Sequence, residues 1–377
     1  MLILAANLPR DSFHVRFLLL SGPGALSPEA VAAGSSVHVL GIDHASCSGL
    51  GLRCLPSALA AIRRYRALTR DVDIVDAWLI PAMIFAAIAQ PLARVPVLMG
   101  GRRSLGDVYA SKSAYRRRLA RLAARRMDVV VANSRAAADE AVNVDGIRAD
   151  HVLVIPNAVV PASPQPGTRT AIRAAWGFDD DVLVVGCVAN YKEGKGLTSL
   201  VTAAHQLRQR MPDLRYVLVG EGPLRADLER AIDRHELTRI VVLHGRTADA
   251  RTLYPAFDIF VQASESEGLP NVVLEAAASG LPIVATSVGG TTEILTANVN
   301  AVLVPKNDLE RLTAAIAEVA DDAALRDRLG RAARARAADY APARLAASTA
   351  ALYRRLVGQS GRRDAATLVD RSASIDE

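Results

Sequence analysis

Aromatic residues, cysteines and long apolar runs are all scarce in this chain of 377 residues. Phe, Trp and Tyr make up 4% of the chain against 51% for hydrophobic residues as a whole, so its cores must be rich in Leu, Val and Ala. The three cysteines, Cys47, Cys54 and Cys187, are an odd number in no metal-ligand spacing, which predicts buried thiols in a reducing cytosol. No apolar run approaches the roughly 20 residues of a membrane span, and no signal-like core follows a charged start. These absences predict a cytoplasmic protein, and its length predicts two domains.

The whole chain has a net charge of +6, and its basic residues cluster in residues 111–127. This segment contains no acidic residue. On a helix, one face of this segment would carry Tyr115, Leu119, Leu122 and Ala123, and the other would carry arginines. Such a helix either lies on an anionic membrane surface or packs on its domain with a solvated basic face, and the sequence leaves both open. Stacking aromatics and a nucleic-acid-binding motif are missing, so no nucleic-acid partner is predicted. The basic residues are Lys112, Arg116, Arg117, Arg118, Arg121, Arg125 and Arg126.

Strand-like and helix-like segments alternate along two stretches, 1–160 and 169–340, which predicts an α/β protein of two domains. Clustered prolines between them indicate a linker at 161–168. After the second stretch we expect a helix at 341–357 and a disordered polar tail at 358–377. Two doubly wound parallel sheets facing each other would place ligands in a cleft at the carboxyl ends of their strands. The clearest expected strands are 13–20, 37–42, 73–78, 96–99, 128–134, 151–159, 183–190, 215–222, 240–245, 281–285 and 300–305, and a short helix is expected at 249–256.

Residues 258–290 predict a strand, a loop, a helix, a second strand and a double-glycine turn, and they carry two notable carboxylates. Glu267 lies in the loop before the helix, and Glu275 lies on the helix itself. The helix N-terminus between them offers free backbone N–H groups and a partial positive charge, which suit a phosphate. An anion site flanked by two hydroxyl-binding carboxylates fits a ligand that carries sugar, diphosphate and ribose in line. The alternative is that both glutamates are merely solvated.

The run SESEGLPNVVLEAAASGLPIVAT, residues 264–286, resembles the acidic signature of the retaining GT-B glycosyltransferases of the family 4 group, the glycosyl transferases group 1. This resemblance extends over about residues 11–356 and implies two Rossmann-like domains that face a central cleft. It implies that the first glutamate contacts the donor sugar, that the second holds the ribose hydroxyls, and that the residues after the first form a phosphate loop. Those residues are Glu267 and Glu275 for the carboxylates, and Gly268, Leu269 and Pro270 for the loop.

The resemblance also implies a donor-phosphate site in the loop ANYKEGKG, residues 189–196. Lys195 and Gly196 match a Lys-Gly pair of the family, and a lysine is a point charge well suited to phosphate. Asn190 stands where most members have an arginine, and Lys192 is expected to supply the missing charge. The alternative for Lys192 is a solvated loop lysine.

Three further positions are assigned by resemblance alone. Gly220 matches the strand-end turn below the nucleotide, and Arg246 is expected at the edge of the base. Arg102 falls where many relatives have a histidine near the reacting carbon, so it is expected to face the acceptor or the leaving phosphate. His244, a lone histidine beside Arg246, is expected to be structural.

Together these assignments predict a hexosyltransferase that moves a sugar from a nucleotide-diphosphate donor to an acceptor hydroxyl with retention of configuration. Its predicted catalytic residues are Glu267, Lys195 and Arg102, and neither a metal nor another cofactor is implied. The expected acceptor is a lipid-linked or cell-surface glycan precursor. If residues 111–127 bind anionic lipid, the protein works at the inner face of the cell membrane. Two alternatives remain open: a nucleotide-sugar epimerase of the same fold, and a non-catalytic donor-binding protein with an incomplete acceptor domain.

The start of the chain departs from the resemblance. Residues 2–12, LILAANLPRDS, resemble the end of the first helix of the family, which predicts that a strand and a glycine-rich loop are missing before them. The rival interpretation makes LILAAN the first strand. That strand would then have to return to a parallel neighbour within too few residues for a crossover.

Overall fold

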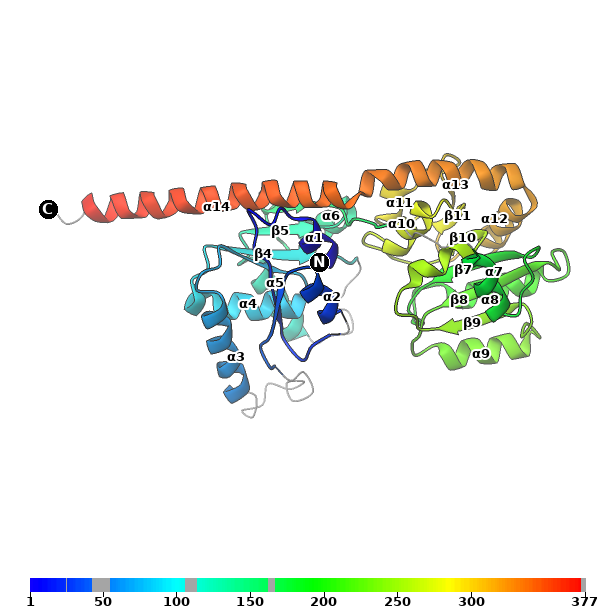
Figure 1. Cartoon of the computed structure of the whole chain (residues 1–377), viewed down its shortest axis with the longest axis horizontal. Coiled ribbons are helices and arrows are strands. Elements are labelled where there is room, and N and C mark those ends of the chain that lie inside the picture. Colours follow the sequence, from blue (N-terminus) through cyan, green and yellow to red (C-terminus); the bar gives the residue numbers. More distant parts are fainter. Residues whose placement is uncertain (25, 43–54, 106–113, 162–166, 374–377) are drawn as a thin grey trace. The chain divides into compact units, whose positions relative to one another are not determined.

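The computed structural model (Figure 1) describes residues 1–373 apart from positions 25, 43–54, 106–113 and 162–166. The chain forms two compact units. The first comprises residues 1–103, 107–156 and 342–377, and the second comprises residues 104–106 and 157–341. The crossing between residues 156 and 157 lies close to the predicted boundary at 160. The C-terminal helix, predicted as a separate segment, belongs to the first unit.

The second unit is built on a six-stranded parallel sheet with the strand order β12-β11-β10-β7-β8-β9. The sheet therefore grows outward from β7 in one direction and from β10 in the other, which is the doubly wound order predicted from the sequence. The strands are β7 (Leu183–Val188), β8 (Leu214–Val219), β9 (Val241–Gly245), β10 (Ile259–Gln262), β11 (Ile283–Thr286) and β12 (Val302–Val304). The helices are α7 (Thr168–Ala175), α8 (Leu197–Leu207), α9 (Arg225–Arg234), α10 (Asn271–Ala278), α11 (Thr291–Ile294), α12 (Leu309–Asp321) and α13 (Ala323–Ala337).

Helices cover both faces of this sheet, because alternate strand residues point to opposite faces. Val185 and Cys187 of β7 belong to a core with residues of α8, α9 and α12. Val184 of the same strand and Phe260 of β10 belong to a second core with residues of α10. Both cores consist largely of Leu, Val, Ile and Ala, as the composition predicts. Cys187 is a buried free thiol, whereas Cys47 and Cys54 lie outside the described residues.

The first unit carries two parallel sheets, one of β1 and β2 and one in the order β3-β4-β5-β6. Its first element is the helix α1, so the prediction that residues 2–7 are helical is confirmed over the rival strand. The strands are β1 (Arg16–Leu19), β2 (Ser36–Val39), β3 (Ile74–Ala77), β4 (Val97–Arg102), β5 (Val129–Ala132) and β6 (Val152–Val154). The helices are α1 (Leu2–Asn7), α2 (Ser27–Ala32), α3 (Leu55–Leu68), α4 (Ile80–Ala93), α5 (Ala114–Ala124), α6 (Arg135–Asn143) and α14 (Pro342–Ala373).

Two expectations about helices are wrong. Residues 249–256 form two separate 3₁₀ turns, Ala250–Thr252 and Tyr254–Ala256. Pro255 suits the start of the second turn but not the inside of one continuous helix, since proline lacks the N–H group that a helix interior requires. The tail predicted to be disordered from 358 instead continues α14 to Ala373, and its Ala, Arg and Leu content favours a helix.

The basic segment forms α5, whose side chains are described from Arg118 onward. Arg118 and Arg121 are exposed, whereas Ala120 and Ala123 are buried. Leu122 was expected on the packed face, yet it is 50% exposed. Across the described part of the chain, no helix combines the length and the apolar character needed to cross a membrane.

Candidate active site

The strand order of the second unit reverses between β7 and β10, which are paired neighbours. In a doubly wound sheet the loops that follow two such strands diverge to opposite faces, and ligands bind in the crevice at their carboxyl ends. The loop after β7 is the segment 189–196, and the loop after β10 is the segment 263–270. Both segments that the sequence singled out therefore lie at this crevice.

An ion pair joins the two loops at the crevice. Lys195 Nζ lies 2.5 Å from Glu267 Oε1, although the two residues are 72 positions apart. Their side chains are only 20% and 15% exposed. Gly196 permits this approach, because it has φ +66° and a Cβ there would lie 2.2 Å from Ala263 O. The structure thus brings together the predicted lysine and the predicted sugar-contacting carboxylate.

The loop Gly268–Leu269–Pro270 is buried and leads into α10. Pro270 is the N-cap residue of that helix, and its carbonyl accepts hydrogen bonds from the backbone N–H groups of Val273 and Leu274. The N–H groups that precede these two at the helix N-terminus are the ones a bound anion can use. Gly290 contacts this loop directly. Its N–H donates a hydrogen bond to Glu267 O at 3.1 Å. A Cβ at position 290 would lie 1.7 Å from Gly268 O, so only glycine fits there.

Glu275 lies on α10, one helical turn further from the crevice than the loop. Its Oε2 accepts a hydrogen bond from the Tyr254 hydroxyl at 2.9 Å. Burial raises the pKa of the Glu275 carboxyl, while the Tyr254 hydrogen bond and the charge of Arg251 oppose that rise. Tyr254 therefore orients a half-buried carboxylate. Sequence reasoning missed Tyr254, because nothing in its neighbourhood along the chain indicates a partner 21 positions away.

The remaining donor-site candidates follow the strands of the same half of the sheet. Gly220 comes directly after β8 and its N–H donates to Gly245 O at 2.9 Å. Arg246 comes directly after β9, and its side chain is exposed. Asn190 and Lys192 come after β7 and are also exposed. These residues share the carboxyl edge of the sheet with Lys195, as predicted, but the structure gives their side chains no assigned role.

His244 is structural, as expected. Its Nδ1 accepts a hydrogen bond from the Trp176 indole N–H at 3.0 Å. The two rings also meet edge to face, with centroids 5.9 Å apart. Burial lowers the pKa of His244, which favours the neutral ring that this acceptor role requires.

Arg102, predicted from the resemblance to face the acceptor or the leaving phosphate, is buried in this structure. It ends β4 in the first unit, and its side chain is 7% exposed. The guanidinium pairs with Glu140 of α6 at 2.8 Å and with Asp145 at 3.3 Å. A buried arginine held by two carboxylates is a structural group. In the free protein the guanidinium faces these two acids, and its contact with the acceptor or the leaving phosphate stays a prediction.

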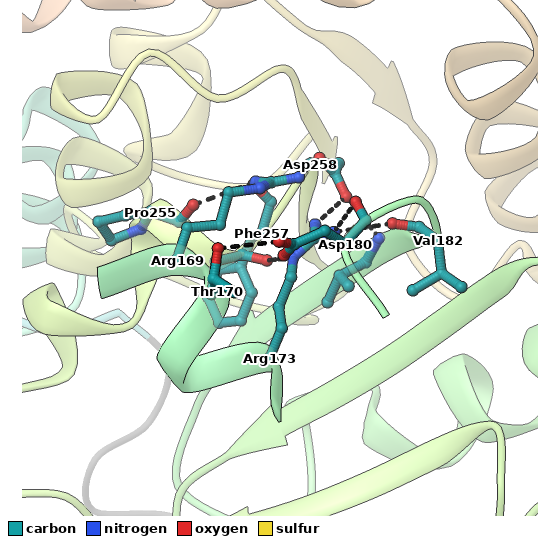
Figure 2. Close-up of polar contacts among 10 residues, drawn as sticks. Arg169, Thr170, Arg173, Asp180, Val182, Pro255, Phe257 and Asp258 are labelled. Carbon is teal, nitrogen blue, oxygen red and sulfur yellow. Dashed lines mark hydrogen bonds and ion pairs between the residues drawn. The ribbon is translucent and has the colours of Figure 1, made fainter. Parts of the chain in front are cut away.

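A second buried network holds the opposite ends of β7 and β10 (Figure 2). Asp258, which precedes β10, accepts hydrogen bonds from Arg173 at 2.5 Å, from Arg169 at 2.6 Å and from Val184 N at 2.7 Å. The Arg173 side chain is fully buried and also donates to three backbone carbonyls, those of Asp180, Val182 and Ala256. This network fixes the two central strands against each other. No local pattern predicts this network, because Arg173 and Asp258 are 85 positions apart.

Comparison with known families agrees with this geometry. Residues 168–336 match the family model described as glycosyl transferases group 1. Residues 1–158 match the model described as glycosyl transferase 4-like domain. The two matches together cover both units apart from the linker region and the C-terminal part of the chain.

Individual relatives extend the comparison. The chain is 29% identical to a GDP-mannose-dependent alpha-(1-6)-phosphatidylinositol monomannoside mannosyltransferase of Mycolicibacterium smegmatis, over 71% of this chain and 72% of that protein. It is 32% identical to a D-inositol 3-phosphate glycosyltransferase of Kribbella flavida, over 60% of this chain and 56% of that protein. The chain spans about half the length of several such relatives. Among solved structures, Anabaena HepE in complex with UDP-glucose aligns with a TM-score of 0.79 at 23% identity, over 93% of each chain. The fold is accordingly that of the GT-B glycosyltransferases.

Proposed function

We propose that this chain, which belongs to the glycosyl transferases group 1 family, transfers a sugar from a nucleoside diphosphate sugar to an acceptor hydroxyl. The observation that carries the proposal is the Lys195–Glu267 pair at the point where the sheet order reverses. A cation, a carboxylate and a helix N-terminus converge there. This combination fits a ligand whose diphosphate and sugar are bound side by side.

Each donor group has a partner in this proposal. The ribose hydroxyls donate to Glu275, whose position Tyr254 fixes. The diphosphate lies on the N-terminus of α10, next to the Lys195 ammonium. Glu267 accepts hydrogen bonds from hydroxyls of the transferred sugar. Lys195 and Glu267 pair with each other in the free protein, so donor binding exchanges that ion pair for contacts to phosphate and sugar.

The reaction breaks the bond between the anomeric carbon and the β-phosphate oxygen, and the electron pair leaves with the diphosphate. Lys195 and the α10 N-terminus stabilise the charge that develops on this leaving group. The acceptor oxygen then bonds to the anomeric carbon from the same face and passes its proton to the departing phosphate oxygen, so configuration is retained. We assign the acceptor to the lipid-linked or cell-surface glycan precursors. The related mannosyltransferase of Mycolicibacterium is named for a phosphatidylinositol monomannoside.

Incubation with labelled donor, once with and once without an acceptor, separates this proposal from its alternatives. A transferase releases nucleoside diphosphate in step with a glycosylated acceptor, and only slowly without one. An epimerase alters the sugar with no acceptor present. A non-catalytic protein binds the donor, which raises its thermal midpoint, but turns nothing over.

The two glutamates are expected to affect binding differently. Glu275→Ala should weaken the binding of UDP or GDP, whichever the wild type binds, because a charged hydrogen-bond partner of the ribose is lost. The expected loss in binding free energy is about 1.5–3 kcal/mol, which is about 10- to 150-fold in affinity. Glu267→Ala should leave the free diphosphate unaffected and weaken only the sugar nucleotide. Calorimetry measures both ligands on both variants. Glu265→Ala, an exposed carboxylate in the same loop, is the matched control. Wild-type affinity for the free nucleotide in Glu275→Ala would exclude the ribose assignment.

The exposed arginines of α5 are expected to hold the enzyme on anionic lipid, where its acceptor lies. Replacing Arg118 and Arg121 with glutamine should lower binding to phosphatidylserine vesicles about 30-fold, since each cation near such a surface contributes about 1 kcal/mol. Vesicle co-sedimentation at several salt concentrations measures this. The control variant replaces Arg331 and Arg334 with glutamine. Both are exposed arginines of α13 in the second unit. Equal losses in both double variants would mean that binding is non-specific, and α5 would then be only a packed helix with a solvated face.

A further inference from the structure

The helix α4 of the first unit exposes an apolar surface. Its sequence, IPAMIFAAIAQPLA, contains no charged residue. Ile88 and Leu92 are 51% and 53% exposed, and the other exposed residues of this helix are Pro81 and Pro91. Single exposed apolar side chains are common on protein surfaces, but an exposed stripe without a polar side chain is a feature of interaction sites.

Two helices pack against α4, and they lie on opposite sides of it (Figure 1). On one side Phe85 meets Tyr65 of α3 edge to face, with ring centroids 5.5 Å apart. On the other side Arg126, just after α5, donates to Ala87 O at 3.4 Å. At about 100° per residue, Phe85 and Ala87 point away from each other, and Ile88 lies on the exposed arc between them. The exposed stripe of α4 therefore runs between α3 and α5.

Leu122 of α5 adds to this stripe. It lies about one turn before Arg126, the residue that contacts α4, and side chains four positions apart share one face of a helix. This place accounts for its 50% exposure, since Leu122 borders the exposed stripe of α4 and not the core. Ile88, Leu92 and Leu122 are called the apolar face below.

Positive charge accompanies the apolar face on both neighbouring helices. The helices α3, α4 and α5 contain no acidic residue. Arg63 and Arg66 of α3 are exposed, and so are Arg118 and Arg121 of α5. In the part of the chain that the structure describes, none of these four arginines forms an ion pair. The surface thus combines exposed apolar side chains with cations that are available to an anionic partner.

This charge decides between two occupants of the surface, a second copy of the chain and a lipid bilayer. In a symmetric dimer the same surface of both copies meets, which would bring arginines against arginines with no acid on the three helices to pair with them. A bilayer offers anionic headgroups to the guanidinium groups. Its acyl region, a few Å deeper, accepts apolar side chains. The surface therefore fits an anionic bilayer.

We propose that the apolar face inserts into the boundary between headgroups and acyl chains of an anionic bilayer, with the arginines of α3 and α5 at the level of the phosphates. The inference rests on the proposed function, because an enzyme held at this depth meets a lipid-linked acceptor there. It also goes beyond binding by charge alone. Arginines alone give an attraction that salt removes, since the Debye length falls to about 3 Å at about 1 M salt. An inserted apolar face gives binding that survives salt.

The test measures co-sedimentation with vesicles of equal parts phosphatidylcholine and phosphatidylserine, at low salt and at about 1 M salt. The variant with Ile88→Ser and Leu92→Ser should bind about tenfold more weakly at low salt, because each side chain loses the apolar area that it would bury. It should also lose the binding that remains at high salt. The variant with Arg118→Gln and Arg121→Gln should keep that remainder while it loses binding at low salt.

A matched control replaces exposed apolar residues elsewhere in the first unit. Leu26 and Val31, at the start of α2 and within it, are 56% and 59% exposed. α2 and α3 cover opposite faces of β1, because Phe17 packs with Ala30 of α2 and Leu18 packs in the cluster that contains Tyr65. Serine at positions 26 and 31 should therefore leave vesicle binding at the wild-type level.

A tryptophan at position 88 reports insertion directly. On the same vesicles, the added emission of Ile88→Trp should shift to shorter wavelength, and lipids brominated in their acyl chains should quench it. Val31→Trp should show neither change. The emission of the native Trp78 and Trp176, measured in the wild type, is subtracted from both. Because this variant keeps a large apolar side chain, it also tests the face if the serine variant does not fold.

Three results would overturn the proposal: no quenching of Ile88→Trp, wild-type binding of the serine variant at both salt concentrations, or a wild type that is dimeric without lipid while the serine variant is monomeric. The last result would make the face a contact between copies. Sugar transfer to a water-soluble acceptor, measured on the same proteins, judges the proposed function separately. Transfer without insertion would refute this inference alone, whereas insertion without transfer would support the lipid-binding face and refute the transfer activity.

Discussion

Replacing Lys195 with alanine is expected to lower kcat for sugar transfer by about 10²–10³, with a smaller change in the KM for the donor. The ammonium stabilises charge that appears on the diphosphate only as the anomeric bond breaks, so its loss acts mainly on the transition state. The side chain is 20% exposed and paired with Glu267, which means that water cannot readily replace it. Steady-state kinetics with saturating donor measure the effect.

A matched control separates this role from simple loss of positive charge. Lys306 follows β12 on the same sheet and is exposed, and Lys306→Ala should retain wild-type kcat. Because Lys195→Ala leaves the mostly buried Glu267 without its partner, the thermal midpoint of this variant is measured as well, so that kcat is compared only for folded protein. A kcat within threefold of the wild type in Lys195→Ala would remove the lysine from the reaction.

Replacing Arg173 with methionine is expected to destabilise the second unit by about 3–5 kcal/mol. The change removes the buried partner of Asp258 and leaves three backbone carbonyls without a donor. Methionine roughly fills the space of the aliphatic part of arginine, so the loss reflects charge and hydrogen bonding more than a cavity. Denaturant unfolding followed by tryptophan fluorescence reports it, because Trp176 ends the helix that carries Arg173.

Arg169→Met is the internal comparison. Arg169 contacts the same carboxylate, yet its side chain is 40% exposed, so its loss should cost about 1 kcal/mol or less. If both variants lower the free energy of unfolding by the same amount, burial does not explain the contribution of the Arg173 contact. If neither loses stability, the network does not hold the strands together.

The parts of the site that the sequence predicts are those carried by short contiguous motifs. Glu267 and Glu275 lie on one strand–loop–helix unit, and Lys195 lies in a loop directly after a recognisable strand. Once alternation indicates a doubly wound sheet, the carboxyl ends of its strands are known to meet at one edge. The approach of Lys195 to Glu267 follows from that topology, although the 2.5 Å contact does not.

The contacts that escape sequence reasoning are side-chain pairs between distant segments. Tyr254 reaches Glu275 from a 3₁₀ turn, and Asp258 binds two arginines of α7. No local pattern marks such partners. Arg102 shows the reverse case. A position matched by resemblance suggested a ligand contact, but the nearby acids of the α6 region, Glu140 and Asp145, bind its guanidinium instead.

The first unit was predicted less completely than the second for a physical reason. Its strands and helices follow the expected alternation, but the pattern of apolar residues does not reveal which strand edges are paired.

The most direct test of the central claim is transfer from a panel of UDP- and GDP-sugars to lipid acceptors, with the product linkage determined by proton NMR. The account predicts that α-linked donors give α-linked products, that nucleoside diphosphate is released in equal amount, and that Lys195→Ala and Glu267→Ala give only traces. A wild-type protein no more active than Lys195→Ala with every donor, or a product of inverted configuration, would contradict it.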